Sequence, residues 1–573
     1  MAELALANIQ HPKFNRRLHD DEAIAFPYLW WFHRRTEIGI AIQSLDTEFR
    51  THVALVEQYI QDRLGQDWRK VDSWLMEGRI TAKYLEYLFV PEGILVSKAE
   101  GVERHQLRGV VVTDWIHVDP SDPRDFATIN VTSWDFGGSF FRTEEKASFA
   151  SLPTAKTDGS FAIQDLFPAY PIKYATPEIV ERLKQRGEMI WRCRFQHYVS
   201  YTGFAGDGMQ PSAESRFMID FSTFNQMHPQ RKKKPSAIIL GDEDMSQDEP
   251  NLGDAFFMCL PAKTVGLNMH KKEWVDLEAD FLEDVRWNDE AFKHLVIDSN
   301  TKELVQAVIT TQLKAEENTD LIRGKGNGLF ILLHGGRGTG KTLTAESVAE
   351  IAKKPLYRVT CGDIGTSAEI VEKYLESVLL LGKTWGCVVL LDEADVFLEE
   401  RSLKNIERNA LVSVFLRVLE YYDGILILTS NRVGTFDEAF KSRIQLNLRY
   451  QNLNEQQRFQ IWTNFIDRIE KLNTQRIPSG GLCKANVGQQ QDFGIDAEEI
   501  RHHLTELAKT NLNDREIRNA ISTARQLAVY KGKPLGYQHI NSVIKEATKF
   551  DEYLREISKG YTADDIRRGR GER

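Results

Sequence analysis

Cysteines are few in this sequence of 573 residues, and no two of them stand at metal-binding spacing. The five are scattered as Cys193, Cys259, Cys361, Cys387 and Cys483. Single, scattered cysteines predict neither a disulfide framework nor a cysteine-ligated metal site, and they are typical of a reducing compartment. We therefore expect an intracellular protein, in the cytoplasm or the nucleus.

Long apolar runs and an excess of positive charge are missing as well. No apolar run approaches the roughly 18 residues of a membrane span, and the N-terminus lacks the basic and apolar segments of a secretory signal. The 73 lysines and arginines are outnumbered by 83 acidic residues, which gives a formal net charge of −10. This balance argues against a broad nucleic-acid-binding surface, and the length predicts two or three domains.

The chain does contain a phosphate-binding pattern. Residues 329–333 are apolar and predict a buried parallel strand, and they are followed by a glycine-rich loop and a helix. Glycines let the backbone turn its N–H groups toward phosphate oxygens, while the helix N-terminus favours an anion. Lys341 would meet the β- and γ-phosphates of ATP, and Thr342 would offer a hydroxyl to Mg²⁺. The predicted nucleotide-binding residues of the loop are Gly335, Gly336, Arg337, Gly338, Thr339, Gly340, Lys341, Thr342 and Leu343.

Two further apolar strands, at 385–391 and 424–429, end in polar residues. Asp392 is expected to hold the Mg²⁺ shell together with Thr342, and Glu393 to polarise the attacking water. Asn431 follows the other strand and offers an amide that can orient this water. Arg443, on the segment 436–444, is placed to reach the nucleotide of a neighbouring subunit, where an arginine supplied in trans neutralises charge in the transition state.

The N-terminal half shows no such chemistry. We expect a helical arm over 1–80, with an aromatic cluster at 27–35 that is either a binding patch or, as we favour, a packing anchor. A β-rich domain over 81–225 follows, with strands broken by proline and glycine turns. By elimination it is a recognition or assembly domain. The range 226–300 is predicted to be a linker, and its basic run at 231–234 is a nuclear import signal, a phosphate patch or, as we favour, a solvated loop.

After the predicted core at 301–450, amphipathic helices indicate a helical lid over 451–555. The helix opening at 511–520 carries Arg515, the first candidate to touch the γ-phosphate, and Arg518, the second. Both residues equally fit a solvated helix face. The tail at 556–573 is basic and expected to be disordered.

This ordered set of motifs resembles an AAA+ ATPase, and most of all the fungal AAA-type ATPases that carry an uncharacterised N-terminal domain. The resemblance is closest over 325–450. It implies an α/β P-loop core, in which a parallel sheet has helices on both faces, a helical lid after it, and a homo-oligomeric ring that is usually a hexamer. By this resemblance, Lys341 and Thr342 match the Walker A motif, and Asp392 and Glu393 match the Walker B motif. Asn431 matches sensor 1, and Arg443 matches the arginine finger.

Two departures from the family pattern bear on function. Gly336 and Arg337 stand where many relatives have two prolines. The segment 360–367 lacks the aromatic loop with which ring unfoldases thread polypeptide, which favours local remodelling over threading. We expect an Mg²⁺-dependent ATPase that acts on an unknown protein client, with nucleic acid an unlikely partner. The alternatives are a nucleic-acid-linked ATPase, supported only by the basic tail and the Lys-rich loop, and a nucleotide-gated scaffold.

Overall fold

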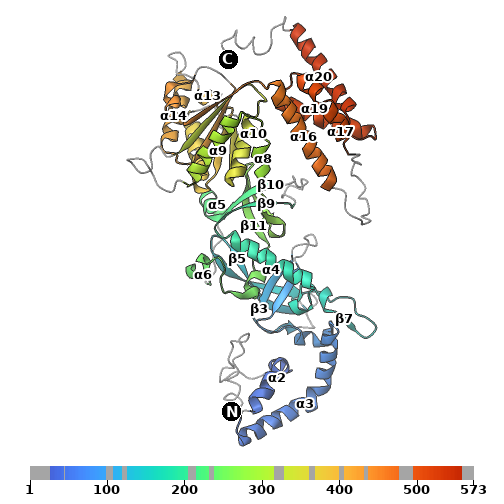
Figure 1. Cartoon of the computed structure of the whole chain (residues 1–573). Coiled ribbons are helices and arrows are strands. Elements are labelled where there is room, and N and C mark those ends of the chain that lie inside the picture. The colour runs from blue at the N-terminus through green and yellow to red at the C-terminus, as the bar shows by residue number, and fades with distance from the viewer. Residues whose placement is uncertain are drawn as a thin grey trace. The chain divides into compact units, whose positions relative to one another are not determined.

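In the computed structural model the chain divides into two compact units, Met1–Val285 and Arg286–Arg573 (Figure 1). Each unit has its own sheets and its own apolar core. The structure describes residues 26–43, 45–98, 107–118, 126–203, 215–231, 238–314, 328–360, 368–398, 406–431, 436–475 and 494–557. The predicted basic tail, most of the Lys-rich run and the segment 361–367 lie outside these residues.

Two helices open the N-terminal unit, α2 (Leu29–Gln43) and α3 (Thr47–Met76). Apolar residues at helical spacing along α3, including Trp68 and Val71, are buried. From the aromatic cluster of α2, the ring of Phe32 packs edge-on against Trp68, with 5.5 Å between ring centroids. The packing interpretation of this cluster therefore holds for Phe32.

The first large sheet of this unit is antiparallel, with the strand order β4-β5-β3-β2-β8 and β6 paired to β5. Its longest strands meet along their whole length around the turn at Gly137 and Gly138, where a glycine with positive φ is present at 138. A separate pair joins β1 to β7. The strands are β1 (Arg79–Thr81), β2 (Ile94–Lys98), β3 (Leu107–Val112), β4 (His117–Val118), β5 (Ala127–Phe136), β6 (Phe140–Phe149), β7 (Ser160–Ala162) and β8 (Ala169–Pro171).

A second antiparallel sheet has the order β12-β11-β10-β9-β13. Its strands are β9 (Gln196–Tyr201), β10 (Ser215–Asp220), β11 (Lys263–Asn268), β12 (Trp274–Glu278) and β13 (Leu282–Asp284). The helices around it are α4 (Pro177–Arg192), α5 (Phe221–Met227), α6 (Asp242–Ser246) and α7 (Gly253–Met258). Three strands of this sheet fall in the range 226–300, for which the sequence predicted a linker. The difference arises because Leu277 and Leu282 complete the core of a sheet begun before residue 225.

The C-terminal unit contains a parallel five-stranded sheet in the order β15-β16-β17-β14-β18. Its strands are β14 (Leu329–Gly335), β15 (Leu356–Thr360), β16 (Val388–Asp392), β17 (Ile425–Ser430) and β18 (Leu446–Tyr450). The helices of this part are α8 (Asp289–Lys293), α9 (Ser299–Lys314), α10 (Lys341–Ala352), α12 (Ala368–Thr384), α13 (Asp395–Leu398), α14 (Ile406–Glu420) and α15 (Glu438–Lys441).

Alternation along the strands distributes apolar side chains between the two faces of this sheet. Ile331 of β14 shares a core with Val348 of α10 and Val305 of α9. On the other face, Gly382 of α12 approaches Val389 so closely that a Cβ at residue 382 would lie 2.4 Å from its side chain. Helices therefore pack against both faces.

A helical lid completes the unit. Its helices are α16 (Glu455–Gln475), α17 (Ala497–His502), α18 (Leu504–Lys509), α19 (Asp514–Tyr530) and α20 (Tyr537–Ile557), shown in orange and red in Figure 1. Trp462, Ile500 and Ile517 are fully buried between them. The parallel sheet and the lid agree with the predicted fold class.

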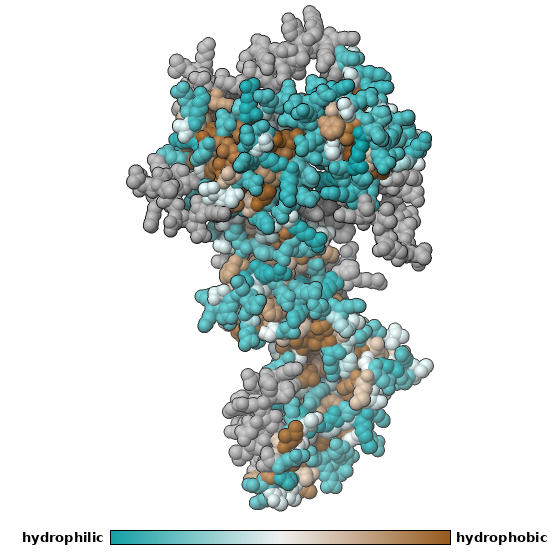
Figure 2. Space-filling model, in the orientation of Figure 1, coloured by the Kyte–Doolittle hydropathy of each residue, from teal (hydrophilic) through white to brown (hydrophobic). Residues whose placement is uncertain are grey.

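The side of the molecule drawn in Figure 2 is mostly hydrophilic, with apolar residues in scattered groups. Among the described residues, no helix has the length and apolarity to cross a membrane.

Candidate functional site

The phosphate-binding pattern forms the turn between β14 and α10. Gly335 has a φ of 147°, and a Cβ there would lie 2.1 Å from the carbonyl oxygen of Tyr450 on the neighbouring strand. Gly340, at the start of α10, has a φ of 93°. Both conformations favour glycine, so the pattern of the loop follows from its backbone.

Lys341 is buried within this turn. Its Nζ donates hydrogen bonds to the carbonyl oxygens of Gly335, at 3.1 Å, and Gly336, at 2.7 Å. The ammonium group thus lies against the loop that the sequence predicts for phosphates. Arg337 and Leu343 are exposed, and Thr339 is buried with its hydroxyl donating to Gly336 at 2.9 Å.

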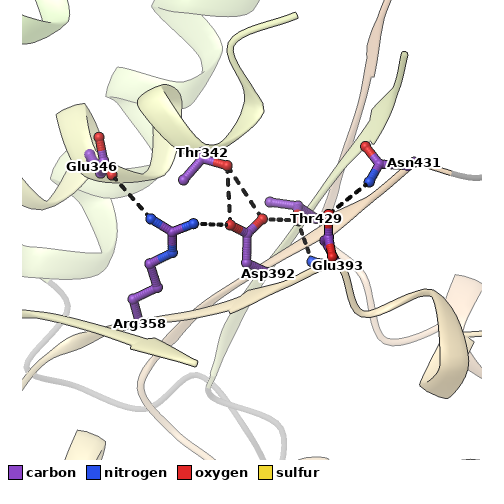
Figure 3. A network of polar contacts seen from close by, with 7 residues as sticks. All are labelled: Thr342, Glu346, Arg358, Asp392, Glu393, Thr429 and Asn431. Carbon is purple, nitrogen blue, oxygen red and sulfur yellow. Dashed lines mark hydrogen bonds and ion pairs between the residues drawn. The ribbon is translucent and has the colours of Figure 1, made fainter. Parts of the chain in front are cut away.

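Asp392, the last residue of β16, is the centre of a polar network (Figure 3). The Thr342 hydroxyl donates toward its two carboxylate oxygens, each 3.3 Å away. The Thr429 hydroxyl lies 2.5 Å from Oδ1, and Arg358 Nη2 lies 2.6 Å from Oδ2. The two residues predicted to serve Mg²⁺ are therefore adjacent, and Arg358 and Thr429 are partners that were not predicted for them.

Glu393 follows in a left-handed conformation, with a φ of 57°. Such a conformation is uncommon for a residue other than glycine and costs backbone strain, which is why it recurs at functional sites. The turn is fixed because the Glu393 amide donates to Thr429 Oγ1 at 2.9 Å. Asn431 Nδ2 lies 3.5 Å from Glu393 Oε1, so the structure brings together the acid and the amide that the sequence assigned to one water (Figure 3).

Asp395 connects these two turns. Its Oδ1 accepts hydrogen bonds from the Ser430 hydroxyl and from the backbone N–H of Asn431, the latter at 3.1 Å. No role was predicted for Asp395. Its place three positions after Asp392, at the first turn of a helix, was the signal that was available.

Electrostatics mark one further acid near the site. Burial raises the pKa of Glu346 on α10 above its usual range, the Asp392 carboxylate raises it further, and the positive charges of Arg358 and Arg518 oppose this. The Arg358 Nη1 atom lies 3.8 Å from Glu346 Oε1. Arg358 therefore bridges the helix that follows the loop and the strand that carries Asp392.

The lid touches the loop through the start of α19. The Asp514 amide donates to the Gly338 carbonyl at 3.1 Å, and a Cβ at residue 338 would lie 2.5 Å from the Asn513 side chain. Of the two lid arginines, both exposed, Arg518 affects the pKa of Glu346 and of Asp514. A contact of either arginine with the γ-phosphate stays a prediction, in which the sequence places Arg515 first and Arg518 second.

Arg443 lies apart from this network. Its Nη1 donates to the Ala439 carbonyl at 3.1 Å, and its Nη2 lies 3.8 Å from Glu420 Oε2 at the end of α14. The guanidinium is partly exposed. None of these contacts joins it to the loop of its own chain, which is compatible with a role at a neighbour's site.

The residues at Asp392 fit Mg²⁺. A hydroxyl and a carboxylate supply hard oxygen ligands, which Mg²⁺ prefers, and Mg²⁺ is ordinarily held by one or two such groups together with phosphates and water. Among the described residues, no group of three or more His, Cys, Asp or Glu side chains is arranged to hold a metal by itself. This pattern suits a metal that arrives with a nucleotide.

Three family models match the chain. Residues 331–452 match "ATPase family associated with various cellular activities (AAA)". Residues 453–561 match the "Fungal AAA+ ATPase lid domain", and residues 70–176 match a "Domain of unknown function (DUF7025)".

Curated relatives match part of the chain. ATPase family AAA domain-containing protein 3B of Homo sapiens is 30% identical over 148 residues, which are 23% of this chain and 22% of that protein. The ATPase family AAA domain-containing protein 3A homolog of Drosophila melanogaster is 32% identical over 136 residues, which are 23% of this chain and 22% of that protein. A putative 26S proteasome regulatory subunit homolog from Methanothermobacter thermautotrophicus is 25% identical over 150 residues, 24% of this chain and 40% of that protein. The matched part of the chain thus spans between about a fifth and two fifths of these relatives.

A loop between β14 and α10, acids at the end of β16 and a helical lid define the AAA class of P-loop domains. With its lid of the fungal type and its N-terminal domain of unknown function, the chain matches the domain set of a fungal AAA+ ATPase with an uncharacterised N-terminal domain.

Proposed function

We propose that this protein hydrolyses ATP with Mg²⁺ in a homo-oligomer, most simply a hexamer, and uses the reaction to remodel a protein client. The observation that carries the proposal is the pairing of Glu393 with Asn431 beside an Asp392–Thr342 contact. Phosphoryl transfer to water depends mostly on positioning and charge neutralisation. Glu393 and Asn431 would position the water, and Lys341 and Arg443 would supply positive charge. Mg²⁺, when bound, would neutralise phosphate charge and orient the phosphates.

Each side chain has a defined task in this proposal. Lys341 holds the β- and γ-phosphates, Thr342 and Asp392 hold the metal, and Glu393 takes a proton from the attacking water while Asn431 orients it. Arg443 contributes positive charge to the neighbouring subunit's nucleotide. Arg515, with Arg518 as second candidate, reports the nucleotide to the lid.

The remodelling role is proposed because a second unit accompanies the AAA domain in the chain. The chain joins an AAA domain to a separate strand-rich unit of unknown function, which we propose selects the client. One relative is a putative proteasome regulatory subunit homolog, a name that points to protein clients. A nucleic-acid-linked ATPase would instead show salt-dependent DNA binding or DNA-stimulated hydrolysis.

Replacing Glu393 by Gln tests the hydrolytic role. The variant should bind ATP as the wild type does but release phosphate at least about 100-fold more slowly, because the amide cannot accept the proton from water. Fluorescent-nucleotide binding and phosphate release measure the two properties. Glu369→Gln, on the exposed face of α12, is the matched control and should hydrolyse normally. Unchanged phosphate release by Glu393→Gln removes this residue from its role. The trapped variant also serves to capture the client.

Mixing two inactive variants tests the role of Arg443. Arg443→Ala keeps an intact loop, and Lys341→Ala keeps an intact arginine, so a mixed interface restores one complete site. Random mixing at equal amounts should restore about a quarter of the wild-type sites in a closed ring. Phosphate release is measured across mixing ratios. Absence of recovery at every ratio contradicts a site shared between subunits.

A further inference from the structure

Arg358 is a basic residue whose position the function proposed above does not explain. It lies on β15, opposite Leu390 of β16, while Thr360 lies opposite Asp392. Its neighbours Tyr357 and Val359 are buried on one face of the sheet, so Arg358 points to the face that Asp392 shares with α10. The strand therefore aims a guanidinium at the residue predicted to hold the metal shell.

The contacts of Asp392 leave little of its carboxylate unused. Oδ2 is 2.6 Å from Arg358 Nη2, Oδ1 is 2.5 Å from Thr429 Oγ1, and the Thr342 hydroxyl lies 3.3 Å from each oxygen. The Asp392 side chain is only 10% exposed, so solvent screens the charge of its carboxylate poorly. The Arg358 side chain is 42% exposed and open to solvent. A guanidinium thus neutralises this carboxylate from the solvent side.

Mg²⁺ would use the same carboxylate, so the two cations compete for one negative charge. Arg358 also lies 3.8 Å from Glu346, which places its charge between two acids. This arrangement has opposite effects on two ligands. Positive charge next to the metal position repels Mg²⁺, but it makes the surroundings of the loop less repulsive toward the phosphates of metal-free ATP.

We propose that Arg358 is a positioning residue that occupies Asp392 until Mg²⁺-bound nucleotide arrives and that limits how strongly the site prefers Mg²⁺·ATP over metal-free ATP. The inference rests on the proposed ATP-binding function. In this proposal the Arg358 guanidinium releases the Asp392 carboxylate when the metal binds and pairs with it again when the metal leaves. In the metal-bound state, Glu346 on α10 is the acid with which the guanidinium remains paired. The residue acts through Asp392 and is not required to touch the reacting atoms.

Binding of a fluorescent ATP analogue to the full chain, with excess Mg²⁺ or with EDTA, tests the proposal without any turnover. The measured quantity is the ratio of the two dissociation constants. Arg358→Gln removes the charge and should raise the preference for Mg²⁺·ATP about tenfold, through tighter metal-bound and weaker metal-free binding. Arg358→Lys keeps the charge and should stay close to the wild type.

Glu346→Gln provides a second, opposite test. Removing this acid leaves the positive charge of Arg358 with Asp392 alone, so metal-free ATP should bind more tightly and the preference for Mg²⁺·ATP should fall. The melting temperature of each nucleotide-free variant shows that it is folded. If Arg358→Gln does not fold, the fall in Glu346→Gln carries the test by itself. Arg417→Gln, which breaks an exposed ion pair with Glu372, is the control and should leave the ratio unchanged.

The outcomes separate the two proposals. If the wild type binds neither form of the nucleotide, the proposed function fails and this inference fails with it. If the wild type binds but Arg358→Gln and Glu346→Gln change both dissociation constants by the same factor, Arg358 has only a structural role and the inference alone is overturned. Shifts of the ratio in opposite directions support it.

Discussion

The two units of this protein differ in where their strands end. All strands of the C-terminal sheet run parallel, so their carboxyl ends meet at one edge, and Lys341, Asp392 and Asn431 converge there from distant parts of the sequence. The large sheets of the N-terminal unit are antiparallel, so successive strands end at opposite edges. In the parallel sheet, polar residues that follow different strands therefore meet at one edge, and sequence motifs there predict a site. In the antiparallel sheets, polar residues that follow successive strands lie at opposite edges.

Buried charge in the N-terminal unit shows the difference. Arg194 is buried, and its guanidinium donates to the carbonyl oxygens of Met245 at 2.8 Å and Gln247 at 2.9 Å. Its guanidinium also lies over the ring of Trp191, 4.6 Å from the centroid. These contacts hold the end of α6 and the residue after it against the turn between α4 and β9. Arg194 is thus held by backbone carbonyl oxygens and by one carboxylate, that of Asp248 at 3.2 Å, while Arg358 in the other unit lies between two acids.

The largest expected effect is a loss of ATP affinity when one glycine of the C-terminal unit is replaced. Gly335→Ala places a Cβ 2.1 Å from the Tyr450 carbonyl oxygen and demands a φ of 147° from alanine, so the loop must distort. We expect ATP affinity to fall at least about 100-fold, measured with a fluorescent nucleotide. Near-normal affinity would contradict the assignment of this loop to phosphate.

Gly187→Ala is the matched change in the N-terminal unit. Its Cβ would lie 2.0 Å from the Phe257 carbonyl oxygen, so α4 and α7 must separate. The unit should lose roughly 1–3 kcal/mol of stability, as overpacked cores do. ATP stabilises only the unit that binds it, so the melting transition that ATP does not shift should fall in temperature while ATP affinity stays unchanged. A loss of ATP affinity would break the comparison by coupling the two units.

The smallest expected effect is a pH dependence confined to the N-terminal unit. Burial, together with the nearby positive charges of Lys173 and Arg35, lowers the pKa of His33 to about 3. In the unfolded chain the pKa is about 6.5, so below that pH the unfolded state takes up a proton that the folded state refuses. This contribution to the free energy of unfolding is complete above pH 6.5 and falls by about 1.4 kcal/mol per pH unit as the pH drops toward 3.

His33→Gln should therefore weaken the acid dependence of the transition that ATP does not shift. Chemical unfolding at pH 7, 6 and 5 measures the slope in both proteins. Equal slopes would mean that His33 is accessible to protons in the folded unit, in contrast to its packing against Trp115.

The sequence was sufficient for the parts of the site that depend on backbone direction. The glycines around Lys341 and the acids ending an apolar strand predicted a loop and a strand edge, and these lie together in the structure. Arg358 was missed because its meaning depends on which face of β15 it occupies and on the neighbouring strand, which no local pattern reveals. The strands at 263–284 were missed for a related reason. β11 pairs with β10, about fifty residues earlier in the chain, and β13 pairs with β9, about eighty residues earlier.

The contact between Gly338 and the lid has a mechanical consequence. Since the Asp514 amide bonds to the carbonyl of Gly338, and Asn513 leaves no space there for a side chain, the glycine loop and α19 form one joint. A change in the loop's curvature is thus carried to a helix of seventeen residues, about 25 Å long. If nucleotide binding shifts the loop, α19 should carry that shift to its far end, where the displacement is larger than at the loop.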